Sequence, residues 1–248
     1  MKPSKETLHA LRVDVFKHWD KVESDQRKGL PRPPLQKPYS PDSRLIDLPD
    51  PAEFQPPLDS LAGALRNRIS RREYSNDPLK LDELSFLLWA TQGVRALPYE
   101  ERVILRTVPS AGARHPFETY LAVLNVDGLK PGVYRYLAIE HKLLVISEDG
   151  SFAERLSAAC ADFAVHAVVT FIWTTVAYRT EWRYPQVAAK LIAQDSGHVC
   201  QNLYIACEGI GAGTCAVGAY EQDVVDELLE LDAEREMVVY SAPVGKVK

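Results

Sequence analysis

A run of prolines constrains the N-terminal part of this chain more than any other feature. Between residues 29 and 57 the sequence carries nine of its 17 prolines. Proline has a fixed φ and no backbone N–H, so it is excluded from helix interiors and from the centre of a sheet. Apolar side chains accompany the prolines, namely Tyr39, Leu45, Ile46, Leu48 and Phe54. We therefore expect an extended arm that lies on the protein or on a neighbouring subunit, rather than a free linker.

The chain divides at this arm. Residues 1–57 contain a short helix over residues 5–20 and the arm, and residues 58–248 form a single folded domain. With 25% charged and 46% hydrophobic residues, the 248-residue chain has the composition of an ordinary globular protein. The formal net charge of −5 argues against nucleic acid as a partner.

The sequence offers no targeting signal and no paired cysteines. No apolar run is long enough to span a membrane, and Met1 to Lys5 contain no apolar signal core. The four cysteines lack the CxxC spacing of metal sites, so we expect buried thiols and no bound metal. These observations predict a cytoplasmic protein without a membrane partner.

Hydrophobic periodicity predicts a mixture of helices and strands in the folded domain. Helices are expected over residues 58–68, 81–91, 151–161, 187–210 and 221–231. Strands are expected over residues 102–107, 119–126, 133–139, 142–147, 165–173 and 237–244. Two dipeptides, Asp127-Gly128 and Pro131-Gly132, mark turns between strands.

A basic cluster follows the first of these helices. Within seven residues lie four arginines and one serine, namely Arg66, Arg68, Ser70, Arg71 and Arg72. Guanidinium groups and a hydroxyl are donors that suit a phosphate group. The simpler alternative is a basic face in contact with solvent, which is the usual role of an arginine cluster.

A loop of small residues precedes the second predicted strand. It begins with Pro109–Gly112 and ends at Arg114, His115 and Pro116. Small residues allow a ligand to approach the backbone closely. Ser110, Arg114 and His115 add a hydroxyl, a cation and an imidazole at one place. The alternative is a plain surface turn, because loops serve as connections as well as binding sites.

The predicted helix at 187–210 contains small residues, including Ala189, Ala193 and Gly197. Glycine inside a helix costs roughly 1 kcal/mol relative to alanine, and close packing against another helix would offset that cost. We expect that other helix to belong to a partner subunit. A helix buried at the centre of one monomer is the alternative.

A glycine-rich stretch, Gly209 to Tyr220, follows this helix. A dinucleotide-binding loop would lie between a strand and the start of a helix, whereas this stretch begins where a helix ends. We therefore interpret it as a helix C-terminus that leads into an extended segment with an exposed backbone.

Four motifs of the chain, in this order, resemble those of the SagB-type dehydrogenases, a branch of the nitroreductase-like FMN superfamily. They are R-I-S-R-R-E-Y at 68–74, P-S-A-G-A-R-H-P at 109–116, D-S-G-H followed by Q-N-L within 195–203, and G-A-G-T-C-A-V-G-A-Y at 211–220. The resemblance spans about residues 58 to 248. The proline-rich stretch that ends near Leu48-Pro49 is also typical of these proteins.

The resemblance implies an α+β, nitroreductase-like fold with a mainly antiparallel central sheet flanked by helices. It also implies a domain-intertwined homodimer with FMN at the subunit interface. By this resemblance, the arginine cluster would bind the FMN phosphate and the loop would contact the edge of the flavin ring. The glycine-rich stretch would supply a backbone N–H near flavin N5. Arg114 would stabilise the anionic reduced flavin. The FMN-binding residues implied are Arg68, Ile69, Ser70, Arg72, Pro109, Ser110, Ala111, Gly112, Arg114, His115, Val217, Gly218, Ala219 and Lys246.

The segment before the long helix departs from the family pattern. Azoline-oxidising members carry a Lys-Tyr pair there that takes part in proton removal, and this chain has Arg183-Tyr184. Arginine stays protonated and does not act as a base as lysine does. Tyr184 is then the candidate catalytic acid/base if Arg183 lowers its pKa; alternatively, both are interface residues. A second departure, Ala113 where many nitroreductases carry Asn, favours the SagB-type branch.

Three functions are compatible with these residues. The first is an FMN-dependent oxidoreductase that oxidises an azoline or a similar heterocycle, on a small molecule or a peptide. The second is a nitro- or quinone-reducing enzyme with NAD(P)H as a transient reductant. The third is a flavin-binding partner protein without catalytic activity.

Overall fold

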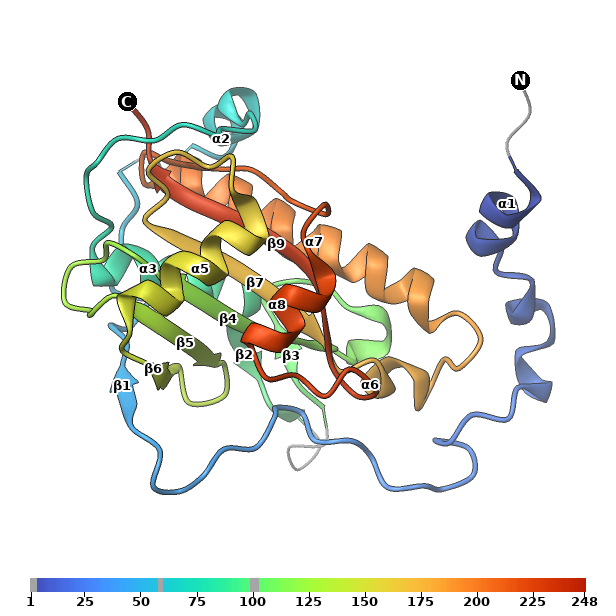
Figure 1. Ribbon diagram of the computed structural model, residues 1–248. Helices are drawn as coiled ribbons and strands as arrows, with labels where there is room; N and C mark the ends of the chain where they lie inside the picture. Colours follow the sequence, from blue (N-terminus) through green and yellow to red (C-terminus); the bar gives the residue numbers. More distant parts are fainter. Residues whose placement is uncertain (1–3, 58–59, 99–102) are drawn as a thin grey trace.

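The centre of the fold is a seven-stranded sheet in which all neighbouring strands are antiparallel (Figure 1). The computed structural model describes residues 4–57, 60–98 and 103–248. In spatial order the strands are β1 (Leu45–Asp47), β6 (Lys142–Ser147), β5 (Gly132–Leu137), β4 (Phe117–Val123), β7 (Val169–Thr175), β9 (Met237–Lys246) and β8 (Ala212–Thr214). Because helices flank this sheet, the predicted α+β fold with a mainly antiparallel sheet is confirmed.

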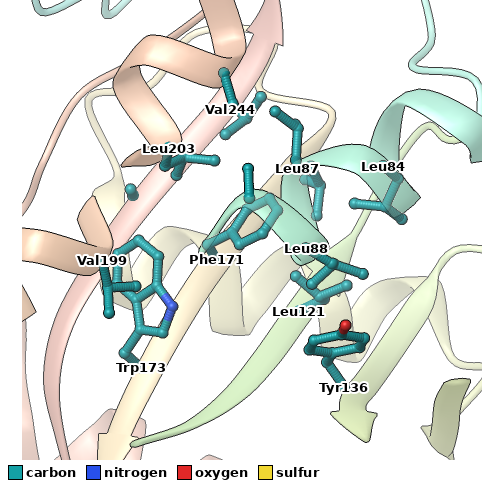
Figure 2. Close-up of a cluster of buried hydrophobic side chains, with 14 of the residues drawn as sticks. Leu84, Leu87, Leu88, Leu121, Tyr136, Phe171, Trp173, Val199, Leu203 and Val244 are labelled. Carbon is teal, nitrogen blue, oxygen red and sulfur yellow. The ribbon is translucent and has the colours of Figure 1, made fainter. Parts of the chain in front are cut away.

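One face of the sheet packs against α3 (Leu81–Gln92) and α7 (Ala188–Gly209). Every residue of the central strands β4 and β7 is buried, including polar ones such as Glu118 and Thr170. Figure 2 shows the side chains that fill this layer, among them Leu84, Leu87 and Leu88 of α3, Phe171 and Trp173 of β7, and Val199 and Leu203 of α7. α3 ends at Gly93 as predicted.

The opposite face is covered by α5 (Gly150–Ala161) and α8 (Gln222–Leu228). Asp149 caps α5, since its side chain accepts a hydrogen bond of 2.9 Å from the Ser151 N–H. A smaller apolar cluster forms beneath the two helices and includes Leu156, Ile172 and Val225. Both faces of the sheet are therefore buried, as the apolar central strands require.

Several predicted elements differ in extent from the observed ones. The strand expected at 165–173 is observed at 169–175, because Val165 instead forms an isolated bridge with Glu73 and His166 has a left-handed φ of +60°. The strand expected at 102–107 is only β3 (Leu105–Arg106), paired with an unpredicted β2 (Val94–Ala96); residue 102 lies outside the described residues. The helix expected at 58–68 is α2 (Leu61–Asn67), and residues 58 and 59 are not described.

The N-terminal segment is helical, as expected, in two pieces: α1 (Lys5–Leu11) and the 3-10 helix η1 (Asp14–Lys21). A further short helix, α6 (Tyr178–Glu181), was not predicted. The four cysteines are buried free thiols. Within the described residues, no group of three or more His, Cys, Asp and Glu side chains could hold a metal ion, and no helix is long and apolar enough to cross a membrane.

The proline-rich arm lies on its own chain. Its residues 45–47 add strand β1 to the edge of the sheet, next to β6. Upstream, buried ionic groups fix the arm: the Lys37 N–H donates to Glu118 Oε1 at 2.7 Å, and Arg179 donates to the same oxygen and to the Pro34 carbonyl. Arg135 donates to the Lys37 carbonyl at 3.0 Å. The arm is thus part of the folded unit.

Replacing Glu118 by Gln should destabilise the protein strongly. The Glu118 and Arg179 side chains are 3% and 4% exposed, so the substitution leaves a buried guanidinium without its carboxylate. Breaking a buried ion pair in this way typically costs about 3–5 kcal/mol. Urea unfolding of Glu118→Gln should show that loss. In the control Glu140→Gln, the carboxylate is an exposed acceptor for Gln36 and Tyr39 on the same arm, and the loss should stay below about 1 kcal/mol. Equal losses would contradict the assignment.

Candidate functional site

Two polar side chains of helix α7 form hydrogen bonds to the segments that contain the predicted site residues. Asp195 is 3% exposed and Tyr204 is 9% exposed, although the helix is otherwise buried through apolar residues. Asp195 holds the loop that begins at Pro109, and Tyr204 holds both the arginine cluster and the glycine-rich stretch. Each attachment is made by hydrogen bonds of normal length.

The loop is braced by Asp195. The Ser110 hydroxyl donates to Asp195 Oδ2 at 2.6 Å, and the Ala111 N–H lies 3.3 Å from both carboxylate oxygens. The same hydroxyl accepts from the His115 N–H at 2.9 Å. Burial raises the pKa of Asp195, and the hydrogen bonds from Ser110 and Ala111 oppose that shift. Ser110 therefore shapes the loop through both its donor and an acceptor position.

Backbone strain is concentrated in this loop. Gly112, Ala113 and His115 have φ values of +58°, +53° and +46°, in the left-handed region that favours glycine. A short 3-10 turn, η2 (Ala111–Ala113), forms its centre. Left-handed backbone in residues other than glycine is sparsely populated and clusters at functional sites. The loop is thus held in one specific shape at the end of β4.

The two basic side chains of the loop are buried. Arg114 Nε donates to the Gly112 carbonyl at 3.0 Å, and its guanidinium lies 5.4 Å from the Trp182 ring centroid. Burial and the nearby charges of Arg32 and Arg183 lower the pKa of Arg114 to about 10, so it remains a cation at neutral pH. Burial and the charge of Arg106 lower the pKa of His115 to about 3. His115 is therefore a neutral imidazole, without a positive charge, at neutral pH.

Tyr184 lies against the same loop. A Cβ atom added at Gly112 would be 2.5 Å from the Tyr184 hydroxyl oxygen, so the hydroxyl packs directly on the loop backbone. The Arg183 guanidinium lies 5.3 Å from the Tyr184 ring centroid, over the ring rather than at the hydroxyl. The structure thus places the predicted catalytic pair next to the predicted flavin-binding loop. Glycine is required at position 112 for two reasons, namely its positive φ and the close approach of Tyr184.

Arg68 and Ser70 converge on Tyr204. The Arg68 guanidinium lies 5.3 Å from the Tyr204 ring centroid, and Ser70 Oγ is 2.9 Å from the Tyr204 hydroxyl. That hydroxyl also accepts from the Ala216 N–H at 2.8 Å, which ties in the glycine-rich stretch. Arg71 is paired with Glu208 at 3.6 Å. Among the described residues, Arg68 has no carboxylate partner, so its charge is available to an anion.

The other predicted FMN-binding residues are more dispersed. Arg72 lies over the Phe163 ring, also without a carboxylate partner among the described residues. Lys246 is paired with Glu83 and donates to the Ile210 carbonyl. Val217 is buried and exchanges backbone hydrogen bonds with Ser241. The exposed residues of the whole predicted FMN-binding set are Ile69, Ser70, Arg72, Pro109, Gly112, Gly218 and Ala219.

One chain therefore carries two half-sites. Asp195 and Tyr204 are nine positions apart on α7, which corresponds to about 13 Å along the helix axis. The loop with Tyr184 lies at one of these positions, and the arginine cluster with the glycine-rich stretch at the other. Between them α7 exposes Gly197, where an added Cβ would meet no atom within 4 Å, and Ala193 is exposed two positions before Asp195.

Two residues that organise the site were missed as site residues from sequence. Asp195 was noted only within its motif, and Tyr204 was not singled out. The available signal was positional: both are polar side chains on the buried side of an otherwise apolar helix, where a polar group needs a specific partner.

The comparison with known families decides the class of protein. The profile of the Nitroreductase family matches residues 65–246. The chain belongs to the nitroreductase family. As a member of this family it is an FMN-dependent oxidoreductase. It is 34% identical over 206 residues to MJ1384 of Methanocaldococcus jannaschii, which carries a provisional nitroreductase name; the match covers 83% of this chain and 98% of that protein.

A second relative of this nitroreductase-family chain is named for peptide processing. The trifolitoxin-processing protein TfxB of Rhizobium leguminosarum bv. trifolii is 29% identical over 133 residues. The match covers 51% of this chain and 36% of TfxB. The likeness is therefore confined to part of both proteins.

Solved structures of the nitroreductase fold resemble the whole chain. A provisional nitroreductase of Ralstonia eutropha JMP134 has a TM-score of 0.69 at 26% identity, covering 88% of this chain and 95% of that one. The E. coli microcin synthetase McbBCD complex, with truncated pro-MccB17 bound, has a TM-score of 0.64 at 17% identity, covering 100% and 85%. A Desulfovibrio desulfuricans structure in complex with FMN has a TM-score of 0.51 at 15% identity, covering 77% and 87%. The last two show a shared fold alone.

Replacing Asp195 by Asn should weaken FMN binding through the loop. Charge-assisted hydrogen bonds from Ser110 and Ala111 are lost, and these are about twice as strong as neutral ones. Because the loop is predicted to contact the flavin, the dissociation constant for FMN should rise about tenfold, as measured by quenching of FMN fluorescence. Asp162→Asn, at an exposed position beyond α5, is the control and should bind FMN normally. Equal affinities in both variants would show that the loop geometry does not depend on Asp195.

Proposed function

We propose that the chain is a SagB-type dehydrogenase that oxidises an azoline or a similar heterocycle carried by a peptide or a small molecule. The observation that carries the proposal is the contact of the Tyr184 hydroxyl with Gly112, which sets a proton-transfer group beside the predicted flavin-binding loop. The names of TfxB, a toxin-processing protein, and of the microcin synthetase complex with its bound pro-peptide support a peptide substrate.

The residues present fit FMN. Arg68 and Arg72 are cations without carboxylate partners among the described residues, and Ser70 adds a hydroxyl, so together they can hold a phosphate. The loop offers backbone in a fixed shape, and Arg114 supplies a permanent positive charge from below it. Lys246, although paired with Glu83, remains a proposed contributor.

Oxidation of an azoline to an azole removes a hydride and a proton. FMN, when bound, supplies the hydride acceptor. The substrate proton passes to the Tyr184 oxygen, which must act as a phenolate to accept it; this oxygen lies at the loop, and the tyrosine ring is held from one side by Arg183. Burial of the Arg114 charge in the same region favours negative charge on the reduced cofactor.

The active form is a homodimer with FMN at the subunit interface. This part of the proposal rests on two observations of the chain. The small residues Ala189, Ala193 and Gly197 recur every four positions and form one exposed face of α7, and the two half-sites lie about 13 Å apart along the same helix. Antiparallel pairing of two α7 helices brings the loop of one protomer towards the Arg68–Ser70 region of the other.

A nitro- or quinone-reducing enzyme driven by NAD(P)H is the second candidate. The provisional names of MJ1384 and of the Ralstonia protein favour it. In that case the bound flavin is bleached rapidly by NAD(P)H and reoxidised by a nitroarene. A flavin that neither NAD(P)H nor an azoline can reduce would leave the third candidate, a flavin-binding partner protein without catalytic activity.

Tyr184→Phe should separate binding from catalysis. The substitution keeps the ring, and therefore FMN and the fold, but removes the hydroxyl at the loop. Turnover of a thiazoline substrate should fall about 10²–10⁴-fold, the usual contribution of general acid–base catalysis. FMN content should not change. Full azoline turnover by the variant would make Tyr184 structural and would favour the reductase, which needs no protein base.

Arg68→Ala should lower FMN retention. Loss of a charge-assisted phosphate bond costs about 1.5–3 kcal/mol, so the dissociation constant should rise at least tenfold. The matched control is Arg66→Ala, an exposed arginine at the end of α2, which should retain FMN during gel filtration. If the control loses FMN equally, the cluster acts only as a diffuse basic face.

Gly197→Leu should break the dimer without unfolding the protomer. No atom of the same chain lies within 4 Å of a Cβ at this position, and leucine is the better helix former. A large side chain at a close helix contact is overpacked, at a cost of typically about 1–3 kcal/mol. Sedimentation should therefore show a weaker dimer of normal thermal stability per protomer. Glu154→Leu, on the exposed side of α5, controls for added apolar surface. An undiminished dimer would place the interface elsewhere.

A further inference from the structure

The N-terminal segment before the arm contacts the proposed catalytic tyrosine. The family match begins at residue 65, so η1 lies outside the matched region. None of the residues of η1 is buried, and Phe16 is 44% exposed. Figure 1 shows α1 and η1 apart from the sheet and its helices. The contacts of the aromatic side chains of η1 are therefore of interest, because this element is otherwise loosely packed.

Two rings of this segment cover Tyr184. The ring centroids of Trp19 and Tyr184 are 5.5 Å apart, and those of Phe16 and Tyr184 are 6.5 Å apart with the planes nearly perpendicular. Phe16 and Trp19 also contact each other at 5.2 Å. These are the separations at which aromatic rings attract one another. The Tyr184 ring thus has Gly112 at its hydroxyl and an aromatic cap from η1.

The cap is held in place at its C-terminal end. Val22 and Ser24 are 6% and 1% exposed, and the Gln26 N–H donates to the Trp182 carbonyl at 2.8 Å. Arg27 donates to the Trp19 and Val22 carbonyls, and its guanidinium lies 5.3 Å from the Trp19 ring centroid. The chain is therefore fixed from residue 22 onwards, while the cap before it is held by ring contacts and by hydrogen bonds to the Trp19 carbonyl.

An open groove lies next to the cap. It has a volume of about 830 Å³ and runs between the N-terminal segment and the start of α7, with Leu11 and Val15 on one wall and Val187 and Ala189 on the other. Val187 is three residues beyond Tyr184. Asp14 and Val15 of η1 line the groove, so it borders the cap, whereas Phe16, Trp19 and Tyr184 are not among its lining residues. Ala189 also belongs to the α7 face proposed for dimerisation, so the proposed dimer would cover that wall.

We propose that η1 is an aromatic lid that selects substrates with a planar aromatic or heteroaromatic ring next to the oxidised bond. The substrate ring packs against Phe16 and Trp19 and is thereby placed at the Tyr184 hydroxyl. Arg27 is a positioning residue that holds the lid closed. The inference rests on the proposed function, in that Tyr184 is taken as the group that meets the substrate.

The direct test is the binding of 2-phenylthiazole, a ring-bearing azole that needs no turnover, to the FMN-loaded protein. The dissociation constant, from perturbation of the flavin spectrum, should rise about five- to tenfold in Trp19→Ala and in Phe16→Ala, because each loses one ring contact. The matched control Leu8→Ala, an exposed apolar residue of α1, should bind the probe normally. FMN content should be the same in all four proteins.

A second measurement follows the lid itself. Arg27→Gln should accelerate tryptic cleavage at Lys17 and Lys21, and 2-phenylthiazole should protect these sites in the wild type. Unchanged cleavage and unchanged probe binding in the variants would contradict the proposal that η1 is a lid.

The outcome is separable from that of the proposed function. If the wild type fails to oxidise 2-phenylthiazoline but binds 2-phenylthiazole through Trp19 and Phe16, the lid stands and the dehydrogenase assignment falls. If the wild type oxidises 2-phenylthiazoline and the lid variants keep its KM and the affinity for the azole, the dehydrogenase assignment stands and the lid falls.

Discussion

The predicted site depends on one hydrogen bond, from the half-buried Ser110 hydroxyl to the buried Asp195 carboxylate on α7. The loop cannot keep its left-handed residues at 112, 113 and 115 without an external constraint, because that backbone is unfavourable for side chains with a Cβ. The Asp195 carboxylate on α7 provides the constraint, and packing of α7 against the sheet holds the helix in place. The core therefore fixes the position of α7, and α7 in turn fixes the conformation of the loop.

The arm and the loop are linked through a second buried polar region. Glu118 lies on β4, directly after the loop, and it holds the arm through the Lys37 N–H and Arg179. Arg179 belongs to α6, the helix that precedes Tyr184. The same carboxylate thus orients the arm, the start of β4 and the segment that bears the proposed catalytic group. Substitutions in the arm should therefore alter the position of Tyr184, because packed, charged groups connect the two.

Much of the fold could be read from the sequence, because the elements are locally encoded. β4 and α3 have apolar patterns that identify them, and Gly93 marks where α3 ends. The site was only partly readable. The motifs were found, but the attachment of Ser70 to Tyr204 joins residues 134 positions apart. The ring contacts of Trp19 with Tyr184 likewise depend on how a proline-rich arm crosses the protein, which periodicity does not encode.

In the proposed homodimer, the separation of the two half-sites on one helix would couple cofactor binding to assembly. A flavin held by the arginine cluster alone would keep its phosphate but lack a fixed environment for its ring, since the loop stands nine residues away on α7. Association of two chains would complete the site, and FMN would then stabilise the dimer by binding the assembled form more tightly than the protomer. Gly197 lies between the two half-sites and Ala193 lies two positions before Asp195, so close approach of two helices there would affect both half-sites. Selection on cofactor binding and on dimerisation would therefore act on the same residues of α7.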